Sequence, residues 1–168
     1  GVKEVREVIE KARQYNGQLK EVPGNILLFI DEIHRFSKSQ QDSLLAAVEQ
    51  GIITLIGATT ENPSFEVIAP LLSRCQVYVL EQLTKKELEE LLQRAIQTDP
   101  FLKLRQVILK ETTALIRISG GDARKMLNLL DLVVQATTGA NEAVITDEFT
   151  MSVAQQQDRK STRLNSSH

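Results

Sequence analysis

Two adjacent carboxylates, Asp31 and Glu32, directly follow a run of five apolar residues at positions 26–30. A continuous apolar run is typical of a strand in a parallel sheet that helices cover on both faces. Ligands of open α/β sheets bind at the carboxyl ends of such strands. There Asp31 can hold Mg²⁺ through water, and Glu32 can orient and polarise an attacking water. The pattern predicts the Walker B motif of an ATPase. A plain strand followed by a helix start, with one carboxylate as the N-cap, is the alternative.

A second apolar strand is expected at residues 52–56, and the polar residues Thr59, Thr60 and Asn62 follow it. If this strand lies beside the first, the Thr60 hydroxyl can lie near the γ-phosphate of a bound nucleotide and sense it. On its own, the Thr59–Thr60 pair would also suit an ordinary strand end or turn. Its spacing from the Asp31–Glu32 pair favours the sensor interpretation.

Two arginines are further candidates for phosphate contacts. Arg74 ends a short helix expected at 64–73, where its charge could favour the helix dipole. It could equally project as an arginine finger that completes the ATP site of a neighbouring subunit, and the local sequence does not separate these roles. Arg124 lies in the first turn of a helix that Asp122 caps. A positive charge is unfavourable there, which suggests a purpose such as reaching a nucleotide phosphate from a lid.

Composition and the remaining reactive side chains exclude several function classes. His34 has no second ligand at metal spacing, so no zinc site is predicted. Cys75 is the single cysteine, and no disulfide can form within the chain. The 20 basic and 22 acidic residues leave a net charge of −2, so any DNA contact must come from a local patch. No apolar run approaches the ~20 residues of a membrane span.

The candidate residues must be positioned by an α/β unit, because strands and helices alternate up to Leu80. After Leu80 the pattern becomes helical, and Thr84 with Glu87 forms a capping box that opens the first helix. The expected domains are an ATPase core over 1–82, a helical domain over 83–157, and a disordered or non-native-looking tail over 158–168. The expected elements are helices at 2–14, 39–50, 64–73, 84–97, 111–119, 122–136 and from 146, with strands at 26–30, 52–56 and 76–80.

Two segments carry a family resemblance: DEIHRFSKSQQD at 31–42 and GATTENPSFE at 57–66. They resemble the replication-associated recombination protein A family, also called RarA or MgsA, whose eukaryotic relative is Werner-helicase-interacting protein. This AAA+ group is close to clamp loaders and branch-migration motors. The similarity runs from Gly1 to about Gln157. It implies an α/β fold, part of an AAA+ P-loop ATPase core with a parallel sheet and flanking helices, followed by a small all-helical lid.

The resemblance also implies residue roles. Asp31 (Mg²⁺, through water) and Glu32 (catalytic) match Walker B, and Thr60 matches sensor 1, a role that Asn62 could share. Arg74 matches the trans-acting arginine finger, and Arg124 matches sensor 2 in the lid. The implied cofactors are ATP and Mg²⁺.

The family resemblance further implies a cytoplasmic, nucleoid-associated, DNA-dependent ATPase at stalled forks and single-strand/double-strand junctions. Its expected partners are DNA, replication or repair proteins, and copies of itself in a tetramer, with no membrane. No G-x-x-x-x-G-K-[ST] loop occurs in this sequence. In the family that loop precedes the position of Gly1, and the assembly region follows about Lys160. We therefore expect an internal fragment whose intact parent is an ATPase, while the fragment alone is inactive.

Two alternatives to this interpretation stay open. The chain could come from a clamp-loader or Holliday-junction branch-migration ATPase. It could also be a non-catalytic AAA+ interaction module, for which the missing phosphate loop is the support.

Overall fold

The computed structural model describes residues 2–18, 26–139 and 142–166 of the 168-residue chain. It divides into two compact units, Gly1–Val79 and Leu80–His168. The boundary expected from the sequence, after residue 82, lies three residues further along the chain. None of the described helices is long and apolar enough to cross a membrane.

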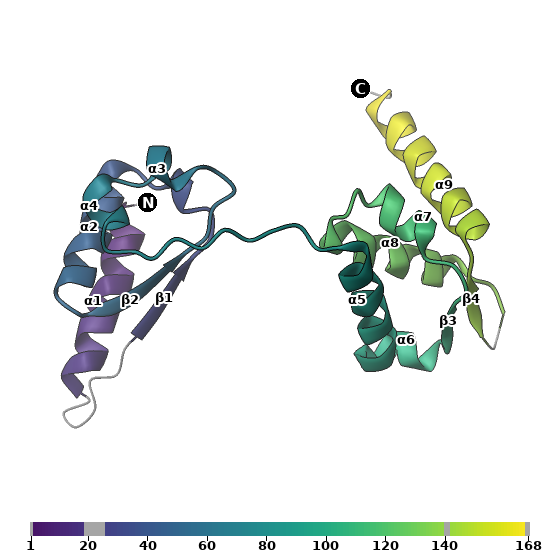
Figure 1. The fold of residues 1–168 in the computed structure, drawn as a ribbon, viewed down its shortest axis with the longest axis horizontal. Coiled ribbons are helices and arrows are strands. Elements are labelled where there is room, and N and C mark those ends of the chain that lie inside the picture. Colours follow the sequence, from purple (N-terminus) through teal and green to yellow (C-terminus); the bar gives the residue numbers. More distant parts are fainter. Residues whose placement is uncertain (1, 19–25, 140–141, 167–168) are drawn as a thin grey trace. The chain divides into compact units, whose positions relative to one another are not determined.

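The first unit is built around a pair of parallel strands. Strand β1 pairs with β2 in a register that places Ile30 opposite Gly57. Helices α1 and α2 lie beside this pair (Figure 1). In chain order the elements are α1 (Val2–Gln18), β1 (Ile26–Ile30), a 3-10 turn η1 (Ile33–Arg35), α2 (Lys38–Glu49), β2 (Ile53–Gly57), α3 (Pro63–Glu66) and α4 (Ala69–Leu72).

The core of the first unit covers one face of the strands. Val5, Ile9 and Ala12 recur at helical spacing on α1 and are buried against α2 and the strands. On the opposite face, Leu27 and Phe29 of β1 are 64% and 61% exposed. The prediction that both faces of β1 are covered is therefore wrong for the described residues. An apolar run reports strand propensity, but it does not say which layers lie against each face.

Two other expectations for the first unit differ from the structure. Residues 76–80 form no strand, and Val79 and Leu80 are 86% and 93% exposed. A strand requires a partner for its N–H and C=O groups, and among the described residues β1 and β2 pair only with each other. The single helix expected at 64–73 is two short helices, because Pro70 has no N–H to donate to the Glu66 carbonyl.

The second unit is mainly helical. The predicted capping box is confirmed: the Thr84 side chain accepts from the Glu87 N–H, and the Glu87 carboxylate accepts from the Thr84 N–H. The structure adds a short parallel strand pair to the expected all-helical arrangement. The elements are α5 (Lys85–Thr98), α6 (Pro100–Leu104), β3 (Val107–Leu109), α7 (Thr113–Ile118), α8 (Ala123–Ala136), β4 (Ala143–Ile145) and α9 (Asp147–Asn165) (Figure 1).

Disorder, one of the two alternatives expected for residues 158–168, is not what the structure shows up to Asn165. Helix α9 continues to Asn165, although residues 158–166 are all exposed. No glycine or proline interrupts the segment, and the Thr162 hydroxyl donates to the Asp158 carbonyl within the helix. The absence of an apolar stripe indicates that this segment has no helix face to bury in a hydrophobic core. It did not show that the backbone leaves the helical conformation.

Candidate functional site

The carboxyl ends of β1 and β2 form the candidate site. Backbone pairing continues past the strands: Ala58 N donates to Ile30 O at 2.9 Å, and Ile33 N donates to Ala58 O at 3.0 Å. The turn that carries Asp31 and Glu32 is thus joined to the turn that leads to Thr60. The sequence prediction that these residues follow neighbouring parallel strands holds in this geometry.

Asp31 and Glu32 are both exposed at this edge. Asp31 Oδ1 accepts from the Glu32 N–H at 3.0 Å, and Glu32 pairs with Arg35 at 3.1 Å. Glu32 has φ 53° and ψ 49°, the left-handed region that few residues other than glycine adopt. Such a conformation costs about 1–3 kcal/mol and persists only where surrounding contacts impose it. Backbone strain thus coincides with the residue that the sequence assigns to catalysis.

The next residues on each side form a second link between the two turns. His34 Nδ1 and Thr59 Oγ1 share a hydrogen bond at 2.9 Å, and Thr59 Oγ1 also accepts from the Glu61 N–H at 3.0 Å. A Cβ on Gly57 would lie 3.0 Å from Ile33 Cδ1. The absence of a side chain at Gly57 therefore lets the η1 turn pack closely against the end of β2.

Thr60 and Asn62 lie on the loop after β2 and are both exposed. Asn62 is the N-cap of α3, and its Oδ1 accepts from the Ser64 N–H at 3.0 Å. This gives Asn62 a structural task in the described chain. Thr60 is a better candidate than Asn62 for a phosphate contact, because it directly follows Thr59, which is hydrogen-bonded to His34.

Gln41, which the sequence analysis did not single out, holds the segment between Asn62 and Arg74. The side chain is 2% exposed and makes three hydrogen bonds. Its Nε2 donates to Phe36 O at 3.1 Å and Glu66 O at 2.9 Å, and its Oε1 accepts from Ile68 N at 2.8 Å. One signal could have identified it: Gln41 is a polar residue three positions before Leu44, on the inward face of α2.

Arg74 follows α4 and contacts its own chain. One guanidinium nitrogen lies 2.8 Å from Glu49 Oε1, and the other donates to Pro70 O at 3.1 Å. The Arg74 and Glu49 side chains are each 44% exposed, so solvent screens this pair and it contributes little stability. Desolvation of the adjacent thiol raises the pKa of Cys75, so the thiol is protonated at neutral pH and is a poor nucleophile.

Arg124 lies in the second unit, in the first turn of α8, and is exposed. The preceding Asp122 caps this helix, accepting from the Lys125 N–H at 3.0 Å. That hydrogen bond is the main reason why the pKa of Asp122 is lowered. The expected capping of this helix by Asp122 is therefore confirmed.

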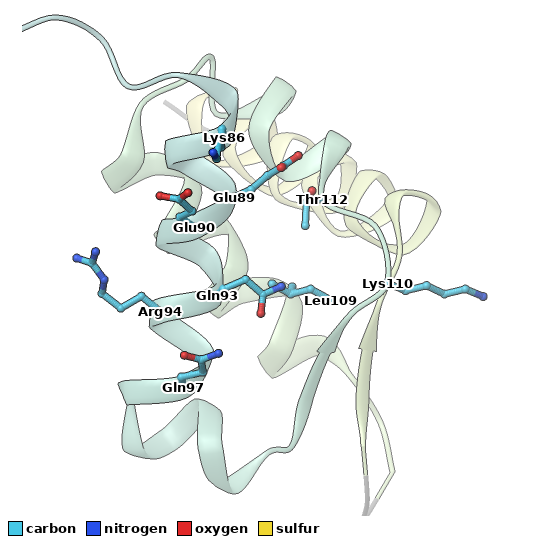
Figure 2. A pocket seen from close by; sticks show the side chains of 9 residues that line it. All are labelled: Lys86, Glu89, Glu90, Gln93, Arg94, Gln97, Leu109, Lys110 and Thr112. Carbon is cyan, nitrogen blue, oxygen red and sulfur yellow. The ribbon is translucent and has the colours of Figure 1, made fainter.

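A groove of about 750 Å³ in the second unit is separate from all these residues. Figure 2 shows Gln93 directed from α5 toward Leu109 of β3 and Glu89 toward Thr112, whereas Arg94 and Lys110 point away. Charges of both signs line the groove, and none of the predicted site residues does so. The groove lining is Lys86, Glu89, Glu90, Gln93, Arg94, Gln97, Leu109, Lys110 and Thr112.

The carboxylate edge fits the way in which proteins hold Mg²⁺ with a nucleotide. Within the described ranges, no three His, Cys, Asp or Glu side chains gather as a metal cluster. Mg²⁺ in nucleotide sites needs only one or two carboxylates, with water and phosphate oxygens as the other ligands. The exposed Asp31 carboxylate, on the turn whose backbone pairs with the end of β2, supplies a donor of this kind.

Comparison with known proteins defines the class of the first unit. Residues 1–83 match the ATPase family associated with various cellular activities (AAA). A solved structure, the Holliday junction branch migration motor RuvB of Thermotoga maritima, superposes with a TM-score of 0.65 at 27% identity, covering 88% of this chain and 48% of that chain. The chain thus has the AAA ATPase fold.

More specific relatives confirm the resemblance to the replication-associated recombination protein A family. The chain is 50% identical over 138 residues to ATPase WRNIP1 of Dictyostelium discoideum, covering 81% of this chain and 15% of that protein. It is 41% identical over 151 residues to replication-associated recombination protein A of Coxiella burnetii, covering 88% of this chain and 33% of that protein. The protein of the same name from Escherichia coli is 44% identical over 140 residues, covering 79% of this chain and 30% of that protein. The chain therefore spans a third or less of the length of these relatives.

Proposed function

We propose that this chain is part of a DNA-dependent ATPase that acts in replication-fork maintenance, recombination and repair. The observation that carries the proposal is the shared edge of β1 and β2. There Asp31 and Glu32 lie beside the turn that leads to Thr60. Relatives named for replication-associated recombination support the process.

The residues divide the work of hydrolysis between them. Asp31 would hold Mg²⁺ through water, which neutralises phosphate charge. Glu32 accepts a proton from the attacking water and orients it. Thr60 donates its hydroxyl to the γ-phosphate. Asn62 can assist only if its amide nitrogen reaches the nucleotide, because its oxygen caps α3.

The two arginines complete the proposed site. Arg74 acts as a finger on the nucleotide of a neighbouring subunit, which requires it to exchange its contact with Glu49 for phosphate oxygens. Because that ion pair is half-exposed, the exchange costs little. Arg124, exposed at the start of α8, acts as sensor 2 from the lid.

The proposal extends to assembly and partners. A trans-acting Arg74 requires a homo-oligomer, and we propose the tetramer that the family resemblance implies. We also propose that the protein acts in the cytoplasm, at the nucleoid, on forks and on single-strand/double-strand junctions. Replication or repair proteins would be its partners there.

Branch migration of DNA junctions is the second candidate function. The structural similarity to the branch migration motor of Thermotoga maritima favours it. Hydrolysis would use the same residues, so the two functions differ in the DNA substrate. Measuring ATPase stimulation by forks, by four-way junctions and by duplex DNA would separate them.

Replacing Glu32 with glutamine in the full-length protein tests the proposal. Glutamine keeps the size and the hydrogen-bonding ability but cannot accept a proton. The Glu32→Gln protein should bind ATP with Mg²⁺ normally and hydrolyse it about 10²–10⁴-fold more slowly. Nucleotide binding by calorimetry and phosphate release would be measured side by side.

The matched control is Glu66→Gln, which changes an exposed carboxylate on α3 of the same unit. It should leave hydrolysis unchanged. Near-normal turnover in Glu32→Gln would remove Glu32 from the mechanism. A wild-type protein that binds ATP but does not hydrolyse it would favour the non-catalytic interaction module.

A further inference from the structure

We propose that His34 is a positioning residue of the ATPase site, acting through its hydrogen bond to Thr59. This inference rests on the proposed ATPase function. His34 Nδ1 lies 2.9 Å from Thr59 Oγ1, and both residues are partly buried. The link joins the turn that presents Glu32 to the loop that presents Thr60.

The position of the link gives it this role. His34 is two residues after Glu32, and Thr59 directly precedes Thr60. Backbone pairing between the two turns ends with Ile33 N donating to Ala58 O. One residue further along each turn, the His34–Thr59 side-chain hydrogen bond is a described contact between the two turns. His34 therefore extends the connection from paired backbone to the residues that would meet the nucleotide.

The same bond also shapes the loop after β2. Thr59 Oγ1 accepts from the Glu61 N–H at 3.0 Å while it is joined to His34. A hydroxyl with two partners has a fixed orientation, so the backbone on both sides of Thr60 is held. Losing His34 frees the hydroxyl to rotate and loosens the loop.

Hydrolysis is sensitive to such loosening. Glu32 and Thr60 contact the reacting atoms from two different segments, and a misplacement of about 1 Å can lower a rate by about 10²-fold. Glu32 is also in a strained left-handed conformation, which relaxes when neighbouring contacts are removed. The link thus acts on turnover more than on nucleotide binding.

Four substitutions in the full-length protein test this role. His34→Ala and Thr59→Val remove the bond. His34→Asn keeps a polar atom one bond from Cγ, where Nδ1 stands, and Thr59→Ser keeps the hydroxyl. We expect kcat to fall by about 10–10²-fold in the first pair, with little change in the Kd for ATP and Mg²⁺. The second pair should recover most of the wild-type kcat.

A second measurement does not depend on activity. Hydrogen exchange of the peptide that covers residues 57–62 should become faster in His34→Ala and return toward wild type in His34→Asn. The double variant His34→Ala/Thr59→Val should be no slower in turnover than either single variant, because both remove one interaction.

Asn16→Ala is the matched control. Asn16 Nδ2 donates to Ile52 O at 2.9 Å, a part-buried side-chain bond at the opposite end of β2. It should lower the melting temperature as much as His34→Ala does and leave kcat unchanged. An equal loss of kcat in Asn16→Ala would show that His34 only stabilises the fold.

Three further outcomes would overturn the positioning role: an unchanged kcat in His34→Ala, no recovery in His34→Asn, or exchange at 57–62 that does not respond. A wild-type protein without ATPase activity would overturn the proposed function itself. An active wild type with an equally active His34→Ala protein would leave the function standing and reject only the role of His34.

Discussion

Glu32 is held in a backbone conformation that its side chain type disfavours, and its neighbours show what holds it. The Asp31 carboxylate accepts the Glu32 N–H, and Arg35 pairs with the Glu32 carboxylate. Ile33 is tied to Ala58 on the next strand. Strain of this kind is common at functional sites, because the direction of the side chain matters there more than local stability.

Arg74 gives the sharpest prediction at the residue scale. If it acts on a neighbour's nucleotide, full-length Arg74→Ala protein keeps an intact pocket and still binds ATP. Its hydrolysis should fall by about 10³–10⁵-fold, because finger residues stabilise charge in the transition state. Mixing it with Glu32→Gln protein, which has a working finger and an inactive pocket, should restore activity in mixed assemblies. Phosphate release is measured across a range of mixing ratios.

The structure supplies a control for this experiment, because Glu49 holds Arg74 in the isolated chain. Glu49→Gln should leave the finger in place and change hydrolysis little. If Arg74→Ala and Glu32→Gln subunits demonstrably exchange but no activity returns, Arg74 acts within its own chain or only packs the end of α4.

The residues at the site differ in how far the sequence could predict them. The placement of Asp31, Glu32 and Thr60 after β1 and β2 was predictable, because parallel strands end at one edge of a sheet. Their roles in hydrolysis stay predictions. The His34–Thr59 bond was not predictable, because the two residues are 25 positions apart and each is ordinary alone. Glu49 and Gln41 contact the Arg74 segment only after α2 folds against it.

At the scale of elements, local sequence signals predicted where helices begin better than they predicted which strands pair. The capping box at Thr84 and Glu87, and the Asp122 cap, fix helix starts within a few residues and so appear in the sequence. Strand formation at 76–80 depends on a neighbouring strand, which local propensity does not specify. The β3–β4 pair also depends on its two strands meeting. Each strand is only three residues long, so its local sequence signal is weak.

Gln41 provides the prediction at this scale. Gln41→Ala leaves the carbonyls of Phe36 and Glu66 and the N–H of Ile68 without their partner. Buried groups left unpaired cost about 1–3 kcal/mol each in the worst case, so we expect a loss of about 2–4 kcal/mol in stability. Denaturant unfolding of the 168-residue chain would measure it.

The neighbouring substitution Asp42→Ala is the control, because Asp42 is exposed on the same helix. Its effect should stay within about 0.5 kcal/mol. Equal effects of the two substitutions would mean that water replaces the Gln41 amide at no cost, and that this side chain does not hold the segment before Arg74.

At the scale of the whole molecule, each unit has a hydrophobic core of its own. Leu44, Leu71 and Ile53 are buried with the strands of the first unit. Leu92, Leu115 and Met126 are buried within the helices of the second. A core drawn from one unit alone can form without the other, so the two units need not share a single unfolding transition.

A matched pair of core substitutions tests whether the units are independent in stability. Leu44 and Leu92 are both 0% exposed, one in each core, and truncating such a leucine to alanine costs about 2–5 kcal/mol. Leu44→Ala should speed hydrogen exchange in β1 and α2 and leave α5 and α8 protected. Leu92→Ala should have the reverse effect. Exchange that rises throughout the chain in both variants would show one cooperative unit, in which case the site at Asp31 and Glu32 would respond to any loss of stability in the lid.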